Sequence, residues 1–130
     1  MIDTTRGVYV QVRAQFLDDQ SIPQQGRYVW AYHIRIHNGG RIAVQLLRRS
    51  WEITDSTGRT LRVEGEGVIG EQPVLDPGET FEYTSGTPLE TPSGFMVGRY
   101  HFIETASGDA FDVPIPAFSL DSPHETGLLH

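Results

Sequence analysis

Residues 27–38 read Arg-Tyr-Val-Trp-Ala-Tyr-His-Ile-Arg-Ile-His-Asn. Large apolar side chains occupy every second position of this stretch, from Tyr28 to Ile36. Alternation with a period of two residues is typical of a β-strand that buries one face. Asn38 is followed by two glycines, and these residue types tolerate positive φ angles. We therefore expect a strand over residues 27–38 that ends in a turn.

The same alternation appears on both sides of this strand. Residues 8–17 alternate apolar and polar side chains and predict a strand, and the polar stretch 18–26, with its Pro and Gly, predicts a loop. Residues 44–54 predict a third strand. Inside it, Leu-Leu-Arg-Arg at 46–49 breaks the alternation, so we expect a β-bulge there.

The second half of the chain reads as further short strands separated by turns. The turn residues 55–58 favour a hairpin that returns along residues 60–66. Further strands are expected at 80–85, 98–105 and 111–115.

No stretch of ten or more residues carries a helical period free of Gly and Pro. About seven short antiparallel strands with almost no helix predict an all-β fold of two packed sheets, an immunoglobulin or fibronectin type III-like β-sandwich. Pro114 and Pro116 cannot donate to a neighbouring strand, so the last strand is expected to lie at a sheet edge or to turn its proline positions away from a partner strand.

Three aromatic residues are expected between the sheets. Trp30 and Trp51 lie on different predicted strands and can fill the space between them. The stretch 98–100, Gly-Arg-Tyr, resembles the start of a strand with a tyrosine corner, in which the hydroxyl of Tyr100 would bond to the backbone.

Length and composition indicate one domain over residues 1–130, with residues 121–130 as a flexible tail.

All ten basic residues are arginines, and seventeen acids give a net charge of −7. Such a chain is a poor ligand for the nucleic-acid backbone, which needs a cationic surface. The clustered arginines read as a solvated stretch that balances nearby acids; they are Arg48, Arg49, Arg59 and Arg62.

The absence of cysteine excludes disulfides, thiolate metal sites and a cysteine nucleophile, and it suits a reducing compartment. No apolar run approaches the roughly 18 residues of a membrane span, and the first residues do not resemble a signal peptide. We expect a cytoplasmic protein with no membrane partner.

The most conspicuous motif is Gly65-Glu66-Gly67-Val68-Ile69-Gly70, which has the glycine spacing of a dinucleotide-binding loop. That site requires a helix after the loop, whose free N–H groups hold the phosphates. Prolines at 73 and 77 prevent one here. The motif therefore predicts a sharply bent connection, and we take it as the candidate binding loop; its residues are Gly65, Glu66, Gly67, Gly70, Glu71 and Gln72. The glycines either shape this loop or leave room for a ligand, and we expect the first.

Other patterns indicate neither a metal centre nor a catalytic centre. His33 and His37 fall on one strand face about 13 Å apart, given a rise of about 3.3 Å per residue, which is too far for one zinc ion. His101 can approach them only if the sheet register allows it. The serines lack a nucleophile elbow and are expected in turns, as in Ser-Gly-Thr-Pro at 85–88. We predict no catalytic residue, no metal ligand and no cofactor.

Several segments together resemble the bacterial ApaG family. They are Val-Gln-Leu-Leu-Arg-Arg-Ser-Trp at 44–51, Gly-Glu-Gly-Val-Ile-Gly-Glu-Gln-Pro at 65–73, Leu-Asp-Pro-Gly-Glu at 75–79, Phe-Glu-Tyr-Thr-Ser-Gly at 81–86 and Ile-Pro-Ala-Phe at 115–118. The resemblance implies a fibronectin type III-like sandwich and a link to cobalt and magnesium tolerance and to diadenosine-polyphosphate metabolism. Similar domains in eukaryotic F-box proteins look like partner-binding modules.

The sequence thus predicts a non-enzymatic module that binds an unidentified protein partner through the loop at 65–73 or its flanking faces, because exposed loops on rigid scaffolds commonly carry recognition. Two alternatives use the same loop. One is binding of a nucleotide such as a diadenosine polyphosphate, or its metal-dependent hydrolysis. The other is direct sensing of a divalent cation through Glu64, Glu66 and Glu71.

Overall fold

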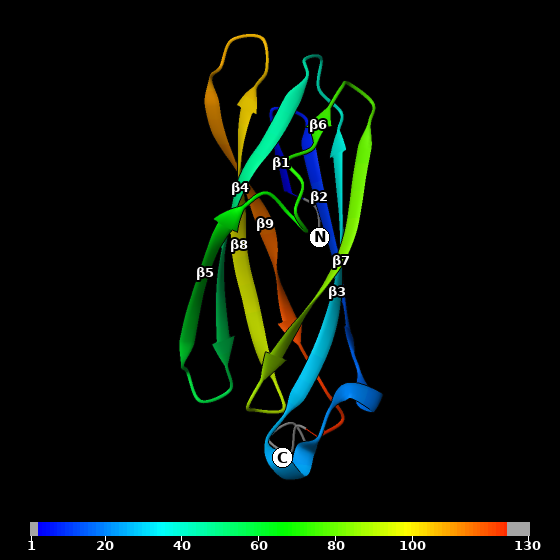
Figure 1. Ribbon diagram of the computed structural model, residues 1–130, viewed down its shortest axis with the longest axis vertical. Coiled ribbons are helices and arrows are strands. Elements are labelled where there is room, and N and C mark those ends of the chain that lie inside the picture. Colours follow the sequence, from blue (N-terminus) through cyan, green and yellow to red (C-terminus); the bar gives the residue numbers. More distant parts are fainter. Residues whose placement is uncertain (1–2, 125–130) are drawn as a thin grey trace.

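Two antiparallel sheets pack face to face in the computed structural model, which describes residues 3–124 (Figure 1). One sheet has the strand order β1-β2-β3-β7, and the other has the order β5-β4-β8-β9 with β6 paired to the start of β4. The strands are β1 (Asp3–Thr5), β2 (Val8–Phe16), β3 (Tyr28–Asn38), β4 (Val44–Asp55), β5 (Thr60–Glu66), β6 (Val74–Leu75), β7 (Thr80–Leu89), β8 (Gly94–Glu104) and β9 (Ala110–Leu120). The predicted fibronectin type III-like sandwich is confirmed.

The core lies between the sheets and is built from the alternating positions of their inner faces. From the first sheet, Trp30 and Ile34 are 1% and 0% exposed. From the second sheet, Trp51 and Phe102 are 3% and 1% exposed. Burial of each such side chain stabilises the fold by about 1.5–3 kcal/mol. The prediction that both tryptophans fill the space between the sheets is confirmed.

Helical structure among the described residues is limited to two short 3-10 turns in the connection from β2 to β3. They are η1 (Asp18–Gln20) and η2 (Pro23–Gln25). No described helix has the length and apolar character that crossing a membrane requires.

The predicted β-bulge in β4 is present, since the register with β8 shifts between Leu46 and Arg48. A second shift, between Met96 and Gly98, interrupts the pairing of β8 with β9. The prediction that the proline-bearing last strand lies at a sheet edge is also confirmed, because β9 closes the order β5-β4-β8-β9.

Three strands are longer than expected, and one predicted turn is wrong. Residues 85–88, Ser-Gly-Thr-Pro, continue β7, where Gly86 pairs with Ala31 and Pro88 with Val29. Because β7 borders only β3, the position at Pro88 that lacks an N–H can face away from the sheet. Strands β8 and β9 likewise extend beyond the predicted ranges 98–105 and 111–115, to 94–104 and 110–120.

Tyr100 does lie on an inner strand face, but its hydroxyl bonds differently from the predicted tyrosine corner. It meets the hydroxyl of Tyr83 on the opposite sheet at 2.5 Å instead of a backbone group. Burial raises the pKa of both phenols well above the ordinary value, so both hydroxyls stay protonated and can share this bond.

The chain beyond β9 begins packed against the sandwich. Trp30 donates its indole N–H to the carbonyl of Asp121 at 2.7 Å, and the Ser122 hydroxyl donates to the carbonyl of Pro92 at 2.6 Å. The tail expected at 121–130 lies outside the described residues from residue 125 onward.

Candidate functional site

The glycine loop, residues 65–72, leads from the end of β5 to β6 and contains a tight two-residue turn. Val68 donates its N–H to the carbonyl of Glu71 at 2.8 Å, and Glu71 returns a bond to Val68 at 2.9 Å. Between them, Ile69 and Gly70 have φ angles of 41° and 80°. Two consecutive positive φ angles are the mark of a type I′ turn.

The β-bulge in β4 anchors this loop. Leu47 has no residue opposite it on β8, and its carbonyl accepts the Gly67 N–H at 2.7 Å and the Gln72 side-chain amide at 3.0 Å. The Arg49 guanidinium donates to the carbonyl of Gly67 at 2.8 Å. These bonds tie the loop to a central strand from several directions, so its tip is held in one conformation.

The three glycines of the motif have different structural roles. Gly67 and Gly70 have φ angles of 63° and 80°, in the region that glycine adopts without strain. A Cβ at Gly65 would come 2.9 Å from the guanidinium of Arg49, so this position makes room for the chain's own arginine. The positive φ angles at Gly67 and Gly70 agree with the expectation that these glycines shape the loop, and the choice between that role and room for a ligand stays a prediction.

The loop presents one apolar side chain to solvent and buries another. Val68 is 0% exposed and belongs to the core, whereas Ile69, at the tip of the turn, is 56% exposed. The candidate residues Glu66, Glu71 and Gln72 are also exposed around the turn. The loop is followed by the short strand β6, so the helix that a phosphate site of the dinucleotide-binding type needs is not there.

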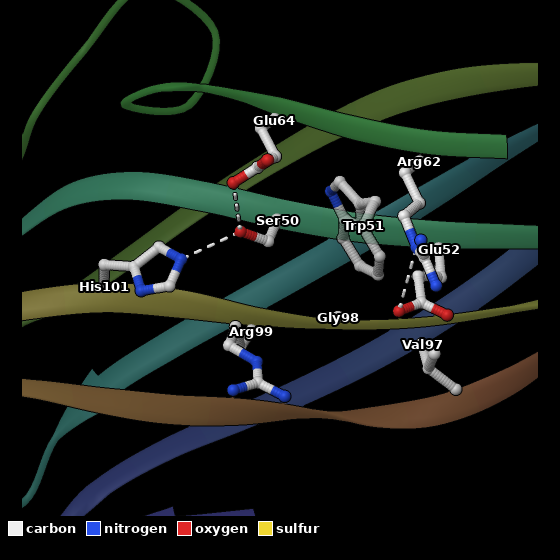
Figure 2. Close-up of a pocket in the computed structure, with 9 residues that line it drawn as sticks. All are labelled: Ser50, Trp51, Glu52, Arg62, Glu64, Val97, Gly98, Arg99 and His101. Atoms are coloured by element: carbon white, nitrogen blue, oxygen red, sulfur yellow. Dashed lines mark hydrogen bonds and ion pairs between the residues drawn. The ribbon is translucent and has the colours of Figure 1, made fainter.

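Beside the loop, the outer face of the second sheet forms a shallow hollow of about 370 Å³ (Figure 2). It is lined by outward side chains of β5, β4 and β8, among them Arg62, Glu64, Ser50, Glu52, Arg99 and His101. Charges of both signs alternate here and pair at 3.5–3.8 Å, as in Arg48 with Glu64, Arg62 with Glu52 and Arg99 with Asp112. Of the four clustered arginines, Arg48, Arg59 and Arg62 pair with acids, whereas Arg49 donates to backbone carbonyls of the glycine loop.

One hydrogen-bonded chain crosses this face. Ser50 lies 2.8 Å from Nε2 of His101, and Nδ1 of the same ring lies 2.7 Å from the carboxylate of Asp112 on β9. Figure 2 shows Glu64 on the other side of Ser50, at the longer distance of 3.4 Å. The expectation that the serines lie in turns is wrong for Ser50, which occupies the middle of β4.

His33, His37 and His101 do not come together in one place. His33 contacts Thr84 at 2.9 Å and Glu82 at 2.9 Å on the first sheet, and His37 contacts Thr80 at 2.7 Å. His101 belongs to the other sheet and cannot join them. Between residues 3 and 124, no three His, Cys, Asp or Glu side chains are arranged to hold a metal ion.

A larger groove, of about 600 Å³, separates the edge strands β5 and β7 at the other end of β5. Its apolar lining includes Ile53, Leu61 and Leu89, and Leu61 is 63% exposed. The ion pair between Arg59 and Glu90, at 3.8 Å, lies at its rim. The groove and the tip of the glycine loop are thus two alternative apolar surfaces for contact with another protein.

Comparison with known proteins relates most of the chain to one family. Residues 18–104 match the ApaG domain family. Protein ApaG of Rhodospirillum centenum is 62% identical over 94% of this chain and 93% of its own length, and Protein ApaG of Paramagnetospirillum magneticum is 62% identical over 98% and 97%. A Bordetella pertussis protein whose crystal structure carries the name ApaA superposes with a TM-score of 0.86 at 48% identity, covering 90% of this chain and 94% of that one.

Proposed function

The chain belongs to the ApaG domain family, and from that premise we propose that it is a non-enzymatic binding module whose partner protein docks on the glycine loop. The observation that carries the proposal is the conformation of Ile69. A β-branched residue at a positive φ angle is a rare outlier, because its Cβ crowds the neighbouring carbonyl.

The conformation of Ile69 carries a cost in conformational free energy. A left-handed conformation costs a residue with a side chain about 1–2 kcal/mol, and Asn or Gly is favoured at this position of a type I′ turn. Ile69 also leaves more than half of its side chain in water, at 56% exposure, so it gains little from burial. Backbone outliers of this kind cluster at functional sites, where strain accompanies a binding role.

The surroundings of Ile69 support a partner surface of one particular chemistry. The turn carries one apolar side chain at its tip, with the exposed carboxylates of Glu66 and Glu71 beside it. A complementary protein surface has a small apolar pocket with a basic rim. The net charge of −7 favours approach to such a surface and disfavours nucleic acid.

This proposal assigns the link to cobalt and magnesium tolerance, and to diadenosine polyphosphates, to the partner and not to a metal or nucleotide site of this chain. Arginines that already pair with acids are poorly placed to hold a phosphate, and the loop lacks the helix that a nucleotide site needs. Both observations support that assignment. The cysteine-free composition supports a cytoplasmic setting for the interaction.

Replacing Ile69 with Asn separates binding from stability. We expect Ile69→Asn to raise the free energy of unfolding by about 1 kcal/mol, because Asn tolerates the left-handed conformation, and to raise the melting temperature by roughly 3–5 °C. The same variant, immobilised and exposed to cytoplasmic extract of the source organism, should lose the protein that the wild type retains. Thermal denaturation and quantitative mass spectrometry of the bound fraction measure the two effects.

Leu61→Asn is the matched control, since Leu61 is an aliphatic residue outside the glycine loop whose exposure, 63%, is close to the 56% of Ile69. It should retain the partner. Retention of the partner by Ile69→Asn, or equal loss in both variants, contradicts docking on the glycine loop.

A further inference from the structure

The geometry assigns to Ser50 the role of an activated nucleophile that takes up an acyl group from activated esters, with His101 as its base and Asp112 as the residue that positions His101. This inference goes beyond the binding function and does not depend on it, since it concerns the outer face of the second sheet and not the glycine loop. It rests on three side chains from three adjacent strands, β4, β8 and β9.

The atoms that meet are those that nucleophilic catalysis requires. Asp112 lies 2.7 Å from Nδ1 of His101, so the neutral ring carries its proton on Nδ1 and keeps its lone pair on Nε2. That lone pair faces the Ser50 hydroxyl at 2.8 Å. A serine hydroxyl bonded to such a base, with the base oriented by a third group, is the arrangement that activates a serine.

Glu64 competes for the same hydroxyl proton, but less well. Its carboxylate lies 3.4 Å from the Ser50 oxygen, at the edge of hydrogen-bonding distance. Nε2 of His101 lies only 2.8 Å from the same oxygen. The proton of Ser50 therefore points to His101 when the ring is neutral.

The hollow makes Ser50 accessible to an ester, but the backbone around Ser50 limits how well the reaction is stabilised. Ser50 lies in mid-strand between β5 and β8, so its backbone groups face two strand ladders and do not form an oxyanion hole. Arg99 lies opposite Ser50 in the register, and its side chain is 60% exposed and pairs with Asp112 at 3.8 Å, so it reaches a developing oxyanion only by leaving that ion pair. We expect a single acylation of Ser50 by esters with good leaving groups, without sustained turnover, which is compatible with a non-enzymatic module.

The proposed step transfers the acyl group of an ester to the Ser50 oxygen. The Ser50 oxygen attacks the ester carbonyl carbon while its proton moves to Nε2 of His101, and Asp112 stabilises the resulting imidazolium. The tetrahedral intermediate collapses, the bond from carbon to the leaving oxygen breaks, and the proton on Nε2 passes to that oxygen. The products are an acylated Ser50 and the free alcohol or phenol.

The test is the reaction of the full chain with p-nitrophenyl acetate, followed by release of nitrophenolate and by mass spectrometry of the intact protein. We expect a burst of about one nitrophenolate per chain, a mass gain of one acetyl group, and its location on the peptide that contains Ser50.

Variants assign the roles. Ser50→Ala should abolish the burst, and His101→Gln should slow acetylation about 100-fold or more, the usual contribution of a general base. Asp112→Asn should slow it strongly, by up to about 10⁴-fold, because the carboxylate no longer holds the His101 proton on Nδ1. Asp112→Glu should restore part of the rate, a rescue that loss of a structural contact alone does not predict. Ser119→Ala is the matched control, because Ser119 is an exposed strand serine bonded to a carboxylate, Asp121, at 2.7 Å, with no histidine.

The outcomes are distinct. Acetylation of Ser50 that is unchanged in Ser119→Ala and lost in His101→Gln supports the assignment. It is overturned by the absence of a burst in the wild type, by acetyl groups spread over several serines, or by a rate that His101→Gln leaves unchanged. The melting temperature of each variant is measured beside its rate, so that unfolding is not read as loss of reactivity.

Discussion

Replacing Trp51 with Ala should lower the free energy of unfolding by about 3–5 kcal/mol, the usual cost of truncating a large buried aromatic side chain. Trp51 is 3% exposed and packs edge-on against Tyr32 and Phe118, with ring centroids 5.6 Å and 5.9 Å away. A domain of this size is stable by about 5–15 kcal/mol, so the loss is a large share of the total. Urea denaturation followed by circular dichroism measures it.

Trp51→Phe is the informative companion. The indole N–H of Trp51 is buried and has no hydrogen-bond partner among the described residues, so phenylalanine removes an unsatisfied donor along with part of the volume. We expect a loss well below that of Trp51→Ala. An alanine variant as stable as the wild type would mean that the two sheets do not pack around this side chain.

The second large effect concerns Gly67, in the glycine loop. Gly67→Ala should cost about 3 kcal/mol, because alanine is strained at a φ of 63° and its Cβ would lie 2.9 Å from the carbonyl carbon of Glu71 and nearer still to its oxygen. The backbone there is fixed by the bonds between Val68 and Glu71, so it cannot move away cheaply.

The variant Gly70→Ala distinguishes the cost of backbone strain from the cost of steric overlap. Its φ is 80°, yet nothing lies within 4 Å of a Cβ built on it, so Gly70→Ala carries only the conformational cost of about 1 kcal/mol. Equilibrium unfolding of both variants should therefore show a clear difference between them. Equal losses, or a milder effect at Gly67, would mean that the loop relaxes freely and is not held as described.

The sequence was sufficient for the architecture because strand patterning is local. Alternation from Tyr28 to Ile36 defined the central strand, and the doubled leucines and arginines at 46–49 indicated the bulge. Strand ends were less predictable, because Gly86 and Pro88 mark turns in most contexts. Only the position of β7 at a sheet edge lets these residues continue a strand.

The candidate site was only partly predictable. The glycine motif marked the loop, and the positive φ angles at Gly67 and Gly70 follow from residue type. The unusual conformation of Ile69 did not follow, because nothing local distinguishes it from an ordinary exposed isoleucine. The pairing of Ser50 with His101 depends on the register of β4 against β8, and these residues are 51 positions apart in the chain. Register across such a separation is fixed by the packed fold.

Site-specific photo-crosslinking tests the proposed docking surface most directly. A genetically encoded diazirine-bearing aliphatic amino acid is placed at position 69 in one protein and at position 61, in the competing groove, in another. Both are irradiated in extract of the source organism. Docking on the glycine loop predicts a discrete adduct from position 69 and little from position 61. Excess wild-type or Leu61→Asn protein should suppress that adduct, and Ile69→Asn should not. An adduct formed only from position 61, or one suppressed equally by Ile69→Asn, would contradict the proposal.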